Sequence, residues 1–342
     1  MIGWHTAPLT EKHVGAAAAL FCGRYELLCQ EVPALAGRYR DPAEVAPLLA
    51  DLLAAGPALG AFGPEGRLVG YLGGRMLPQF LGQQRGVYVP EWAHGVAADA
   101  PGREDVYRQL YAAAAATWVA RSHLNHAVTI LAGDEATRRA WFWSGFGLAV
   151  VDAVRDLKTP LTAICDESLT IRPALQDDVP ALLPLYIAHQ AYYRRSPMFV
   201  PKAPFGGAAE LVEALANPKR LIWLAADVDG QVLGFMQQRA DATDACTIVR
   251  DPKTLACDGA YVLPAARRRG TAAALLQQMV SWARRRGFTR LALDFEVTNL
   301  PGGRFWLRHF TPVCYSLARR VDDRILVPWD VGTGKGPEDL DL

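Results

Sequence analysis

The sequence predicts an α/β (α+β) fold that is built twice in tandem along the chain. Residues 58–75 read ALGAFGPEGRLVGYLGGR and residues 222–239 read IWLAADVDGQVLGFMQQR, so each segment is an apolar strand, a turn containing glycine and a second strand. An unbroken separation of 164 positions over about ninety residues predicts two copies of one domain. The pairs at this separation are Gly66 and Gly230, Gly70 and Gly234, Arg75 and Arg239, Trp118 and Trp282, and Phe146 and Phe310.

The same order of elements is predicted in both copies. A helix precedes the hairpin, and a third strand, a long helix, a further strand, a short helix and a closing strand follow it. The long helix is predicted at 106–121 and at 271–286, and in the second copy its apolar residues recur every three or four positions. This order predicts domains at 1–156 and 169–330, a linker at 157–168, and a flexible, glycine-rich acidic tail at 331–342.

The charge, the cysteine content and the targeting patterns of the sequence exclude several classes of partner and compartment. The 36 basic and 35 acidic side chains give a net charge of +1, which argues against a nucleic-acid or membrane surface as a partner. The six cysteines show no metal-ligand spacing, so we expect reduced, buried thiols and no metal. The absence of a signal-peptide pattern or a long apolar run predicts a cytoplasmic protein. We also expect a monomer or a homodimer. Few lysines and many alanines favour a bacterial source.

A basic loop that ends in glycine joins a strand to a helix in the second copy. Residues 262–272 read VLPAARRRGTA, in which the strand ends at Pro264 and the helix begins after Gly270. The first amides of a helix have no partner within it and lie at the positive end of its dipole, so they favour an anion. Gly270 and the small Thr271 and Ala272 leave room for phosphate oxygens. The segment therefore predicts a diphosphate-binding loop.

This pattern resembles the GNAT acetyltransferase superfamily, whose signature is a V-x-P strand end followed by Arg/Gln-x-x-Gly-x-Gly/Ala at the start of a helix. Val262, Pro264, Arg267, Gly270 and Ala272 match that signature. The resemblance implies two GNAT-like domains, each a mixed, mostly antiparallel sheet flanked by helices, with acetyl-CoA or coenzyme A as the cofactor. It implies that the loop amides bind the pyrophosphate and that the preceding strand bonds the pantetheine arm. The residues implied to bind the cofactor are Val262, Leu263, Arg267, Arg268, Arg269, Gly270, Thr271, Ala272 and Asn299.

The sequence contains an internal control for this loop. Arg284–Gly287 repeats the tetrapeptide RRRG at the end of a helix, where arginines suit the negative end of the dipole and glycine suits the cap, so that second occurrence is structural. In the first copy the separation of 164 places Val106 opposite Gly270, and Glu104 and Asp105 would repel phosphate. We therefore expect the first domain to be a degenerate scaffold without CoA.

Acetyl transfer to an amine needs an acid for the leaving thiolate. In the family a tyrosine four residues before a Gly-Phe pair often serves, but the matching residue here is Phe305, and Trp141 in the first copy, and neither donates a proton to a thiolate. Tyr315 on the closing strand and Tyr261 beside the loop are the substitutes. The alternative for each is a tyrosine packed in the sheet.

The same reaction needs a base for the amine. The strand at 290–297 alternates, so that Asp294 and Glu296 share the face opposite its apolar residues. Glu296 and Asp258 are the candidates, against the alternative of ordinary solvated carboxylates. Asn299 matches the asparagine that opens the family's next helix and often contacts CoA, and its alternative is an ordinary helix cap.

The sequence therefore predicts an acyl-CoA-dependent N-acyltransferase that moves an acetyl group to the amine of a small molecule by direct attack in a ternary complex. Two alternatives remain open: a non-catalytic acyl-CoA-binding sensor or interaction protein, which the missing tyrosine favours, and a tandem enzyme similar to mycothiol synthases. Residues 192–205 (YYRRSPMFVPKAPF) follow the first helix of the second copy, where the family selects its acceptor. Arg194 and Arg195 there favour an acidic or polar acceptor.

Overall fold

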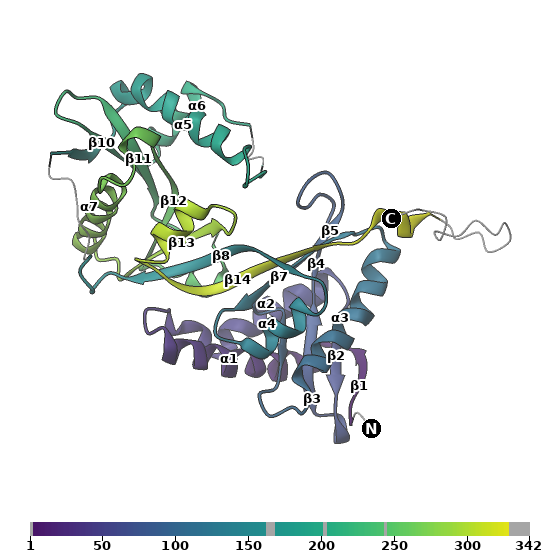
Figure 1. The fold of residues 1–342 in the computed structure, drawn as a ribbon. Coiled ribbons are helices and arrows are strands. Elements are labelled where there is room, and N and C mark those ends of the chain that lie inside the picture. The colour runs from purple at the N-terminus through teal and green to yellow at the C-terminus, as the bar shows by residue number, and fades with distance from the viewer. Residues whose placement is uncertain (1–2, 162–167, 201–203, 243–244, 328–342) are drawn as a thin grey trace.

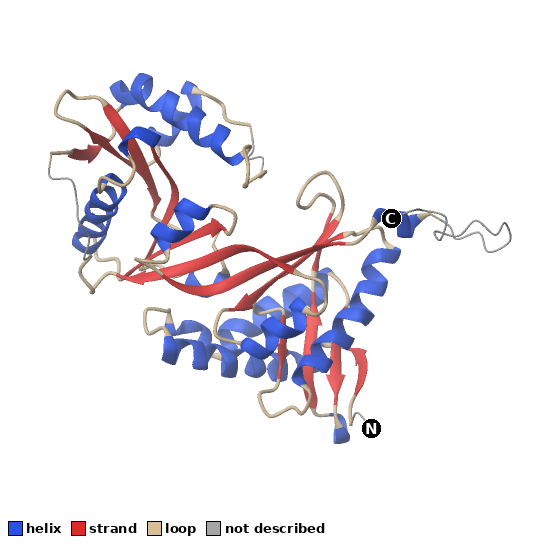
Figure 2. Cartoon of the chain, viewed as in Figure 1, coloured by secondary structure: helices blue, strands red, loops and turns tan. Residues whose placement is uncertain are grey.

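The computed structural model of the 342-residue chain has two lobes that are connected by long paired strands (Figure 1). The structure describes residues 3–161, 168–200, 204–242 and 245–327. The predicted tail at 331–342 and residues 162–167 of the predicted linker at 157–168 lie outside these residues. Helices pack on the sheets in both lobes, which confirms the predicted α/β class (Figure 2).

The first copy contains eight of the strands among the described residues. They are β1 (His5–Pro8), β2 (Ala58–Phe62), β3 (Leu68–Gly73), β4 (Arg75–Leu77), β5 (Gly86–Val89), β6 (His94–Val96), β7 (Asn125–Leu131) and β8 (Gly147–Asp156). Its α-helices are α1 (Val14–Glu31), α2 (Pro42–Ala55), α3 (Arg103–Ala120) and α4 (Glu135–Phe142). Two of these helices begin after an aspartate that caps them: Asp41 accepts from an amide of α2, and Asp134 accepts from an amide of α4.

The second copy follows a similar order with six strands among its described residues. Its strands are β9 (Thr170–Pro173), β10 (Arg220–Ala226), β11 (Val232–Arg239), β12 (Thr254–Val262), β13 (Arg290–Glu296) and β14 (Thr311–Arg320). Its α-helices are α5 (Val179–Tyr193), α6 (Ala208–Ala216), α7 (Thr271–Arg285) and α8 (Leu300–Trp306). The short 3-10 helices of the chain are η1 (Glu11–His13), η2 (Gly37–Arg40), η3 (Pro64–Gly66), η4 (Gln176–Asp178), η5 (Thr247–Val249), η6 (Pro264–Ala266) and η7 (Asp323–Leu326). Because β14 starts 164 positions after β8, and β13 starts 165 positions after β7, the tandem repeat is confirmed.

The two copies exchange their last strands. The long sheet has the order β4-β5-β7-β14-β8-β13-β12-β11-β10-β9, and a second sheet has the order β1-β2-β3-β6. β14 therefore lies between β7 and β8 of the first copy, and β8 lies between β14 and β13 of the second, with antiparallel pairing throughout. Figure 1 shows β8 in teal and β14 in yellow running side by side between the lobes. The last strand of each copy thus extends the sheet of the other, which the repeat alone did not predict.

The register of this exchange relates the two copies by a local two-fold symmetry. Val151 of β8 lies opposite Tyr315 of β14, and these positions are themselves 164 residues apart. On one side Arg290 of β13 lies opposite Asp156, and on the other Asn125 of β7 lies opposite Arg320, its repeat-related partner. Contacts in one copy can therefore be compared with those at the related positions of the other.

The hydrophobic cores also contain side chains from both copies. The core of the first lobe includes Cys246, Ile248 and Val249, which lie in the segment between β11 and β12 of the second copy. The core beneath α7 includes Val151 and Ala153 from β8 of the first copy. The five cysteines among the described residues are free and buried, as expected, while Cys165 lies outside those residues. The division into domains at 1–156 and 169–330 stays a prediction, because the exchanged strands pack across it.

We expect residues 169–342 not to fold as an isolated fragment. Without β8, β13 has an open edge, and the apolar side chains that Val151 and Ala153 cover are exposed to water. Circular dichroism should show no cooperative melting transition for the fragment alone. Co-expression with residues 1–161 should restore an equimolar complex that melts cooperatively. A fragment that melts cooperatively by itself would show that the exchange is dispensable.

Candidate functional site

The parallel strands β12 and β13 pair over only a short stretch. Residues 254–256 pair with residues 290–292, and the register ends there. Beyond this point β12 pairs only with β11, and β13 only with β8. Within the described sheet, the inner backbone groups of residues 257–262 and 293–296 therefore take no part in the ladder. An extended ligand placed between the two strands would meet backbone groups that no β12–β13 pairing uses.

The N-terminus of α7 is built as an anion-binding site. Gly270 is its N-cap and has a φ of 87°, a left-handed conformation that side chains strongly disfavour. No side chain caps the helix and its first turn contains no acidic residue. The first amides of α7 are therefore left for an anion, with the positive end of the helix dipole behind them.

Arg267 fixes the loop that precedes this helix. Its Nε donates a hydrogen bond to the carbonyl oxygen of Val262 at 3.0 Å. Its guanidinium lies over the ring of Tyr192 at 5.7 Å and over the ring of Tyr261 at 5.5 Å, which favours cation–π attraction. Arg267 is thus held by three neighbours and shapes the loop.

The remaining loop residues divide into buried and exposed groups. The hydroxyl of Thr271 donates to the carbonyl oxygen of Ala266 at 3.0 Å, and Thr271 is buried. Arg268 and Arg269 are exposed, and Arg268 has a φ of 64°. Two cationic side chains therefore stand in solvent next to the uncapped helix start.

Asn299 caps α8, as one of the two sequence interpretations expected. Its Oδ1 accepts from the amide of Gly302 at 3.1 Å and from the hydroxyl of Tyr192 at 3.1 Å. Tyr192 therefore touches both Asn299 and Arg267, and it connects the loop before α7 to the start of α8. Sequence reasoning placed Tyr192 only in the acceptor-selecting segment 192–205 and did not connect it to the loop or to Asn299. A contact of Asn299 with a cofactor stays a prediction.

Asp258 lies at a β-bulge. The register between β11 and β12 shifts between Gln237 and Gln238, so Asp258 has no partner opposite it. Its side chain is 22% exposed, and Arg239 lies 4.0 Å away. Burial raises the pKa of Asp258, while Arg239 and Arg220 act in the opposite direction. The bulge therefore presents a carboxyl group whose pKa is raised by burial. A raised pKa suits a group that exchanges protons.

Glu296 ends β13 on the face opposite α7. Leu293 and Phe295 belong to the core beneath α7, whereas Asp294 is exposed and Glu296 is half-buried, so the predicted alternation is confirmed. The hydroxyl of Tyr193 hydrogen bonds to Glu296. Burial and this carboxylate raise the pKa of Tyr193. We call the face of β13 that carries Asp294 and Glu296 the acidic face.

Tyr315 lies on the exchanged strand β14. It is half-buried between Val151 of β8 and Ile130 of β7, and it packs against the cores of both lobes. Phe305, at the position of the family's tyrosine, lies against the ring of His309 at 5.0 Å. The structure thus places Tyr315 at the junction of the copies, and its role as an acid stays a prediction.

The first copy differs at the start of the corresponding helix. The N-cap of α3 is Gly102, with a φ of 66°, so Gly102 and not Val106 is the structural counterpart of Gly270. α3 begins one turn earlier than the separation of 164 implies, and Val106 is a buried residue within the helix. The predicted match of Val106 with Gly270 is therefore wrong, because a constant separation cannot register an added helical turn. Glu104 does lie in the first turn of α3, as expected.

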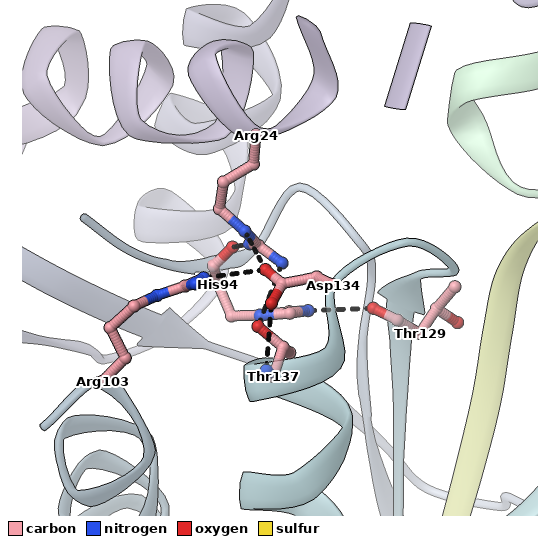
Figure 3. A network of polar contacts seen from close by, with 6 residues as sticks. All are labelled: Arg24, His94, Arg103, Thr129, Asp134 and Thr137. Atoms are coloured by element: carbon pink, nitrogen blue, oxygen red, sulfur yellow. Dashed lines mark hydrogen bonds and ion pairs between the residues drawn. The ribbon is translucent and has the colours of Figure 1, made fainter. Parts of the chain in front are cut away.

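An ion-pair network joins α1, α3 and α4 in the first copy (Figure 3). The carboxylate of Asp134 accepts from Nε of Arg24 at 3.0 Å and from Nη2 of Arg103 at 2.9 Å. Although burial alone favours its neutral form, Arg24 holds the pKa of Asp134 below its usual range. At the related positions the second copy has Asn299 in place of Asp134 and His189 in place of Arg24. α7 begins with Thr271 where α3 begins with Arg103, so the second copy lacks both the carboxylate and the arginine pair of this network.

A cavity of about 510 Å³ lies beside this network. Its wall mixes acidic and basic side chains, so its charge does not match that of a diphosphate as the loop before α7 does. The charged residues in the wall are Arg24, Arg103, Arg139, Glu31, Glu104, Asp134 and Glu135.

Comparison with known proteins identifies the family. The sequence model of the acetyltransferase (GNAT) family matches residues 188–310, which include the loop, α7 and β13. An aminoglycoside N(6')-acetyltransferase type 1 of Serratia marcescens is 30% identical over 112 residues, or 32% of this chain and 75% of that protein. The chain belongs to the GNAT acetyltransferase family. It is therefore an N-acetyltransferase, of a family that uses acetyl-CoA to acetylate amines.

Other similarities agree with this family. An aminoglycoside N(6')-acetyltransferase type 1 of Klebsiella aerogenes is 32% identical over 93 residues, or 27% of this chain and 59% of that protein. A GCN5-related N-acetyltransferase from Sphaerobacter thermophilus matches with a TM-score of 0.57 and 18% identity, over 93% of this chain and 95% of that one. The GNAT fold therefore accounts for both copies of this tandem acetyltransferase. Among the described residues no helix is long and apolar enough to cross a membrane, and no cluster of metal-ligating side chains occurs.

We expect Asp134→Asn to destabilise this acetyltransferase by about 3–5 kcal/mol, because it leaves Arg24 charged and buried without its partner. Asparagine can still cap α4, so the loss reports the ion pair. A folded-state pKa below the unfolded value contributes stability above pH ~4, which is lost only in stronger acid, so the difference should be constant from pH 5 to 8. Urea denaturation at these pH values measures it.

The matched control is Asp99→Asn, which breaks the exposed pair of Asp99 with Arg67. Exposed pairs contribute little, so its urea midpoint should stay close to that of the unchanged protein. Equal loss in both variants would contradict the structural role of the buried network.

Proposed function

We propose that the second copy carries the acetyl-CoA site of this enzyme and transfers an acetyl group to the amine of a small molecule, by direct attack in a ternary complex. The observation that carries the proposal is the uncapped start of α7, preceded by two exposed arginines and placed next to two parallel strands whose mutual pairing ends at residues 256 and 292. That arrangement suits a ligand with a diphosphate and a long amide-containing arm.

The residues of the loop have separate tasks in this proposal. The amides of Gly270, Thr271 and Ala272 hold the pyrophosphate, and Arg268 and Arg269 add positive charge. Val262 and Leu263 supply the backbone groups for the pantetheine arm. The first copy binds no CoA, because Glu104 stands in the first turn of its helix and Asp134 occupies its arginine pair.

The chemistry divides between the donor and the side chains. Acetyl-CoA supplies an activated thioester, and the enzyme has to remove a proton from the acceptor ammonium and return one to the departing sulfur. Asp258 or Glu296 takes the proton from the amine, directly or through water. Tyr315 stays the candidate for the acid.

The acceptor that fits this site is a cation. Asp258, Asp294 and Glu296 lie on the acceptor side of the strands, whereas Arg194 and Arg195 are exposed at the end of α5. Carboxylates attract an ammonium group and an acidic acceptor is disfavoured, which replaces the expectation drawn from the two arginines. The two curated relatives are named for acetylation of aminoglycosides, which are amines.

One assay distinguishes the proposal from its two alternatives, a CoA-binding sensor and an enzyme similar to mycothiol synthases. Release of free CoA is followed with acetyl-CoA and a panel of amines that contains aminoglycosides, polyamines and an amino-sugar thiol precursor. Turnover with a cationic amine supports the proposal, turnover only with the thiol precursor supports the second alternative, and CoA binding without turnover supports the sensor.

We expect Ala272→Glu to weaken CoA binding by about 10–100-fold, because it places a carboxylate at the position where α3 carries Glu104, beside the expected pyrophosphate. The helix dipole favours this charge, so the melting temperature without ligand should not fall. Ala272→Gln, of the same length but neutral, should retain most of the affinity.

Calorimetric titration should give one CoA per chain in the unchanged enzyme. Two equivalent sites, or unimpaired binding in Ala272→Glu, would overturn the placement.

We expect Glu296→Gln or Asp258→Asn to lower kcat by about 10²–10⁴-fold, because the variant side chain cannot accept the proton of the amine. The dissociation constant of CoA should change little, since neither residue belongs to the loop. Steady-state kinetics with the best amine of the panel, together with CoA titration, separate the two effects. Full kcat in both variants would show that another group or water deprotonates the amine.

A further inference from the structure

The exchange of strands brings a carboxylate of the first copy next to the acidic face. Asp152 of β8 lies directly opposite Asp294 of β13 in the antiparallel register. Side chains at such positions are neighbours, with Cβ atoms about 4.5–5.5 Å apart. Asp152 is 6% exposed, whereas Asp294 is exposed on the face that also carries Glu296. The pair therefore has one buried member and one that solvent reaches.

The symmetry-related pair in the first copy shows that the fold does not require two carboxylates here. Ser316 corresponds to Asp152 and Thr129 corresponds to Asp294, and they lie opposite each other in the same way. Their hydroxyl groups are hydrogen bonded at 2.8 Å, and Tyr88 continues the chain at 3.1 Å. Two neutral hydroxyl groups can therefore occupy this cross-strand pair and hydrogen bond to each other. Like charges directly opposite each other destabilise a sheet, so the second copy carries an arrangement that works against its own stability.

The surroundings of Asp152 favour a shared proton. The amide of Cys246 donates to its Oδ1 at 3.2 Å. Burial, followed by the charge of Asp294, raises the pKa of Asp152 to about 7, and the buried Glu91 acts in the same direction. The thiol of Cys314 also lies in this group of contacts. The ionisable groups that act on Asp152 in the described part of the chain, Asp294, Glu91 and Cys246, are acids.

We propose that Asp152 of the first copy completes the acceptor site of the second, as a positioning residue that acts through Asp294. At low pH the two carboxylates share one proton, and in this state the pair binds the acceptor weakly. Loss of that proton to solvent gives the pair its second negative charge, and Asp294 then holds the ammonium group of the acceptor. This inference rests on the proposed function for its substrate, and it assigns to the first copy a direct part in acceptor binding.

The test is the dependence of amine binding on pH in Asp152→Asn, which retains the shape of the side chain but not its charge. Between pH 6 and 8 an aliphatic acceptor stays protonated, so changes report the protein. In the unchanged enzyme the KM for the amine should fall by about tenfold as pH rises from 6 to 8, because the pair titrates in this range. In Asp152→Asn that dependence should shrink to less than about twofold, with kcat and CoA affinity changing less than KM.

Two further variants separate positioning from folding. Ser316→Ala alters the related position in the first copy and should leave the pH dependence of KM unchanged. The double variant Asp152→Ser, Asp294→Thr installs the hydroxyl pair that the first copy already uses, so it should melt at least as high as the unchanged protein at pH 8. It should nevertheless have lost the pH-dependent part of amine binding.

Carbon NMR of the labelled aspartate carboxyl groups provides a readout that does not need turnover. One carboxyl carbon should titrate near pH 7 in the full chain, and it should be missing in Asp152→Asn. Titration of spermidine, a small polycation, into the full chain then measures binding directly at pH 6 and 8. If no amine turns over but spermidine binding still depends on Asp152 and pH, the proposed reaction fails and the composite site stands. An unchanged pH dependence in Asp152→Asn, or no carboxyl group titrating between pH 6 and 8, overturns the inference.

Discussion

The antiparallel contact between β8 and β14 is the interaction on which the rest of the molecule depends. Each of these strands has both edges occupied, one by the other and one by a strand of the opposite copy. Strands of both copies therefore complete the one ten-stranded sheet, and neither copy forms its part of that sheet without the other. The core beneath α7 and the core of the first lobe contain side chains from both copies for the same reason. Two domains of one fold are in this way combined into one structural unit.

The two copies are related by symmetry but differ in the charged side chains beside their corresponding helix N-termini. Where two helix N-termini and an arginine pair gather positive charge, the first copy supplies its own anion, the carboxylate of Asp134. The second copy has Asn299 at that position, an amide that caps the helix equally well but carries no charge. In the first copy this built-in anion occupies the arginine pair. In the proposed function, acetyl-CoA supplies the anion at the uncapped start of α7.

The reverse asymmetry occurs at the exchanged strands. There the first copy is neutral, with Ser316 hydrogen bonded to Thr129, and the second copy places Asp152 opposite Asp294. Charge is thus removed from the first copy's binding face and concentrated on that of the second. Because Asp152 comes from β8, the first copy is more than a scaffold: it contributes to the surface that a cationic acceptor would meet. Retention of a tandem arrangement has a physical reason if one copy completes the site of the other.

The sequence by itself determined the repeat, the order of elements and the loop at residues 262–272, since hydrophobic periodicity, glycine positions and helix-start chemistry are local properties. It also placed Glu296 and Asp294 on one face of a strand, because alternation along a strand needs no knowledge of its neighbours. Only the tertiary structure decided that β8 and β14 are exchanged, that Tyr192 joins Arg267 to Asn299, and that Asp152 faces Asp294. The match of Val106 with Gly270 failed because an added helical turn leaves no trace in a constant separation. Strand partners and cross-strand contacts depend on residues more than a hundred positions apart, and a linear pattern carries no information about which edges meet.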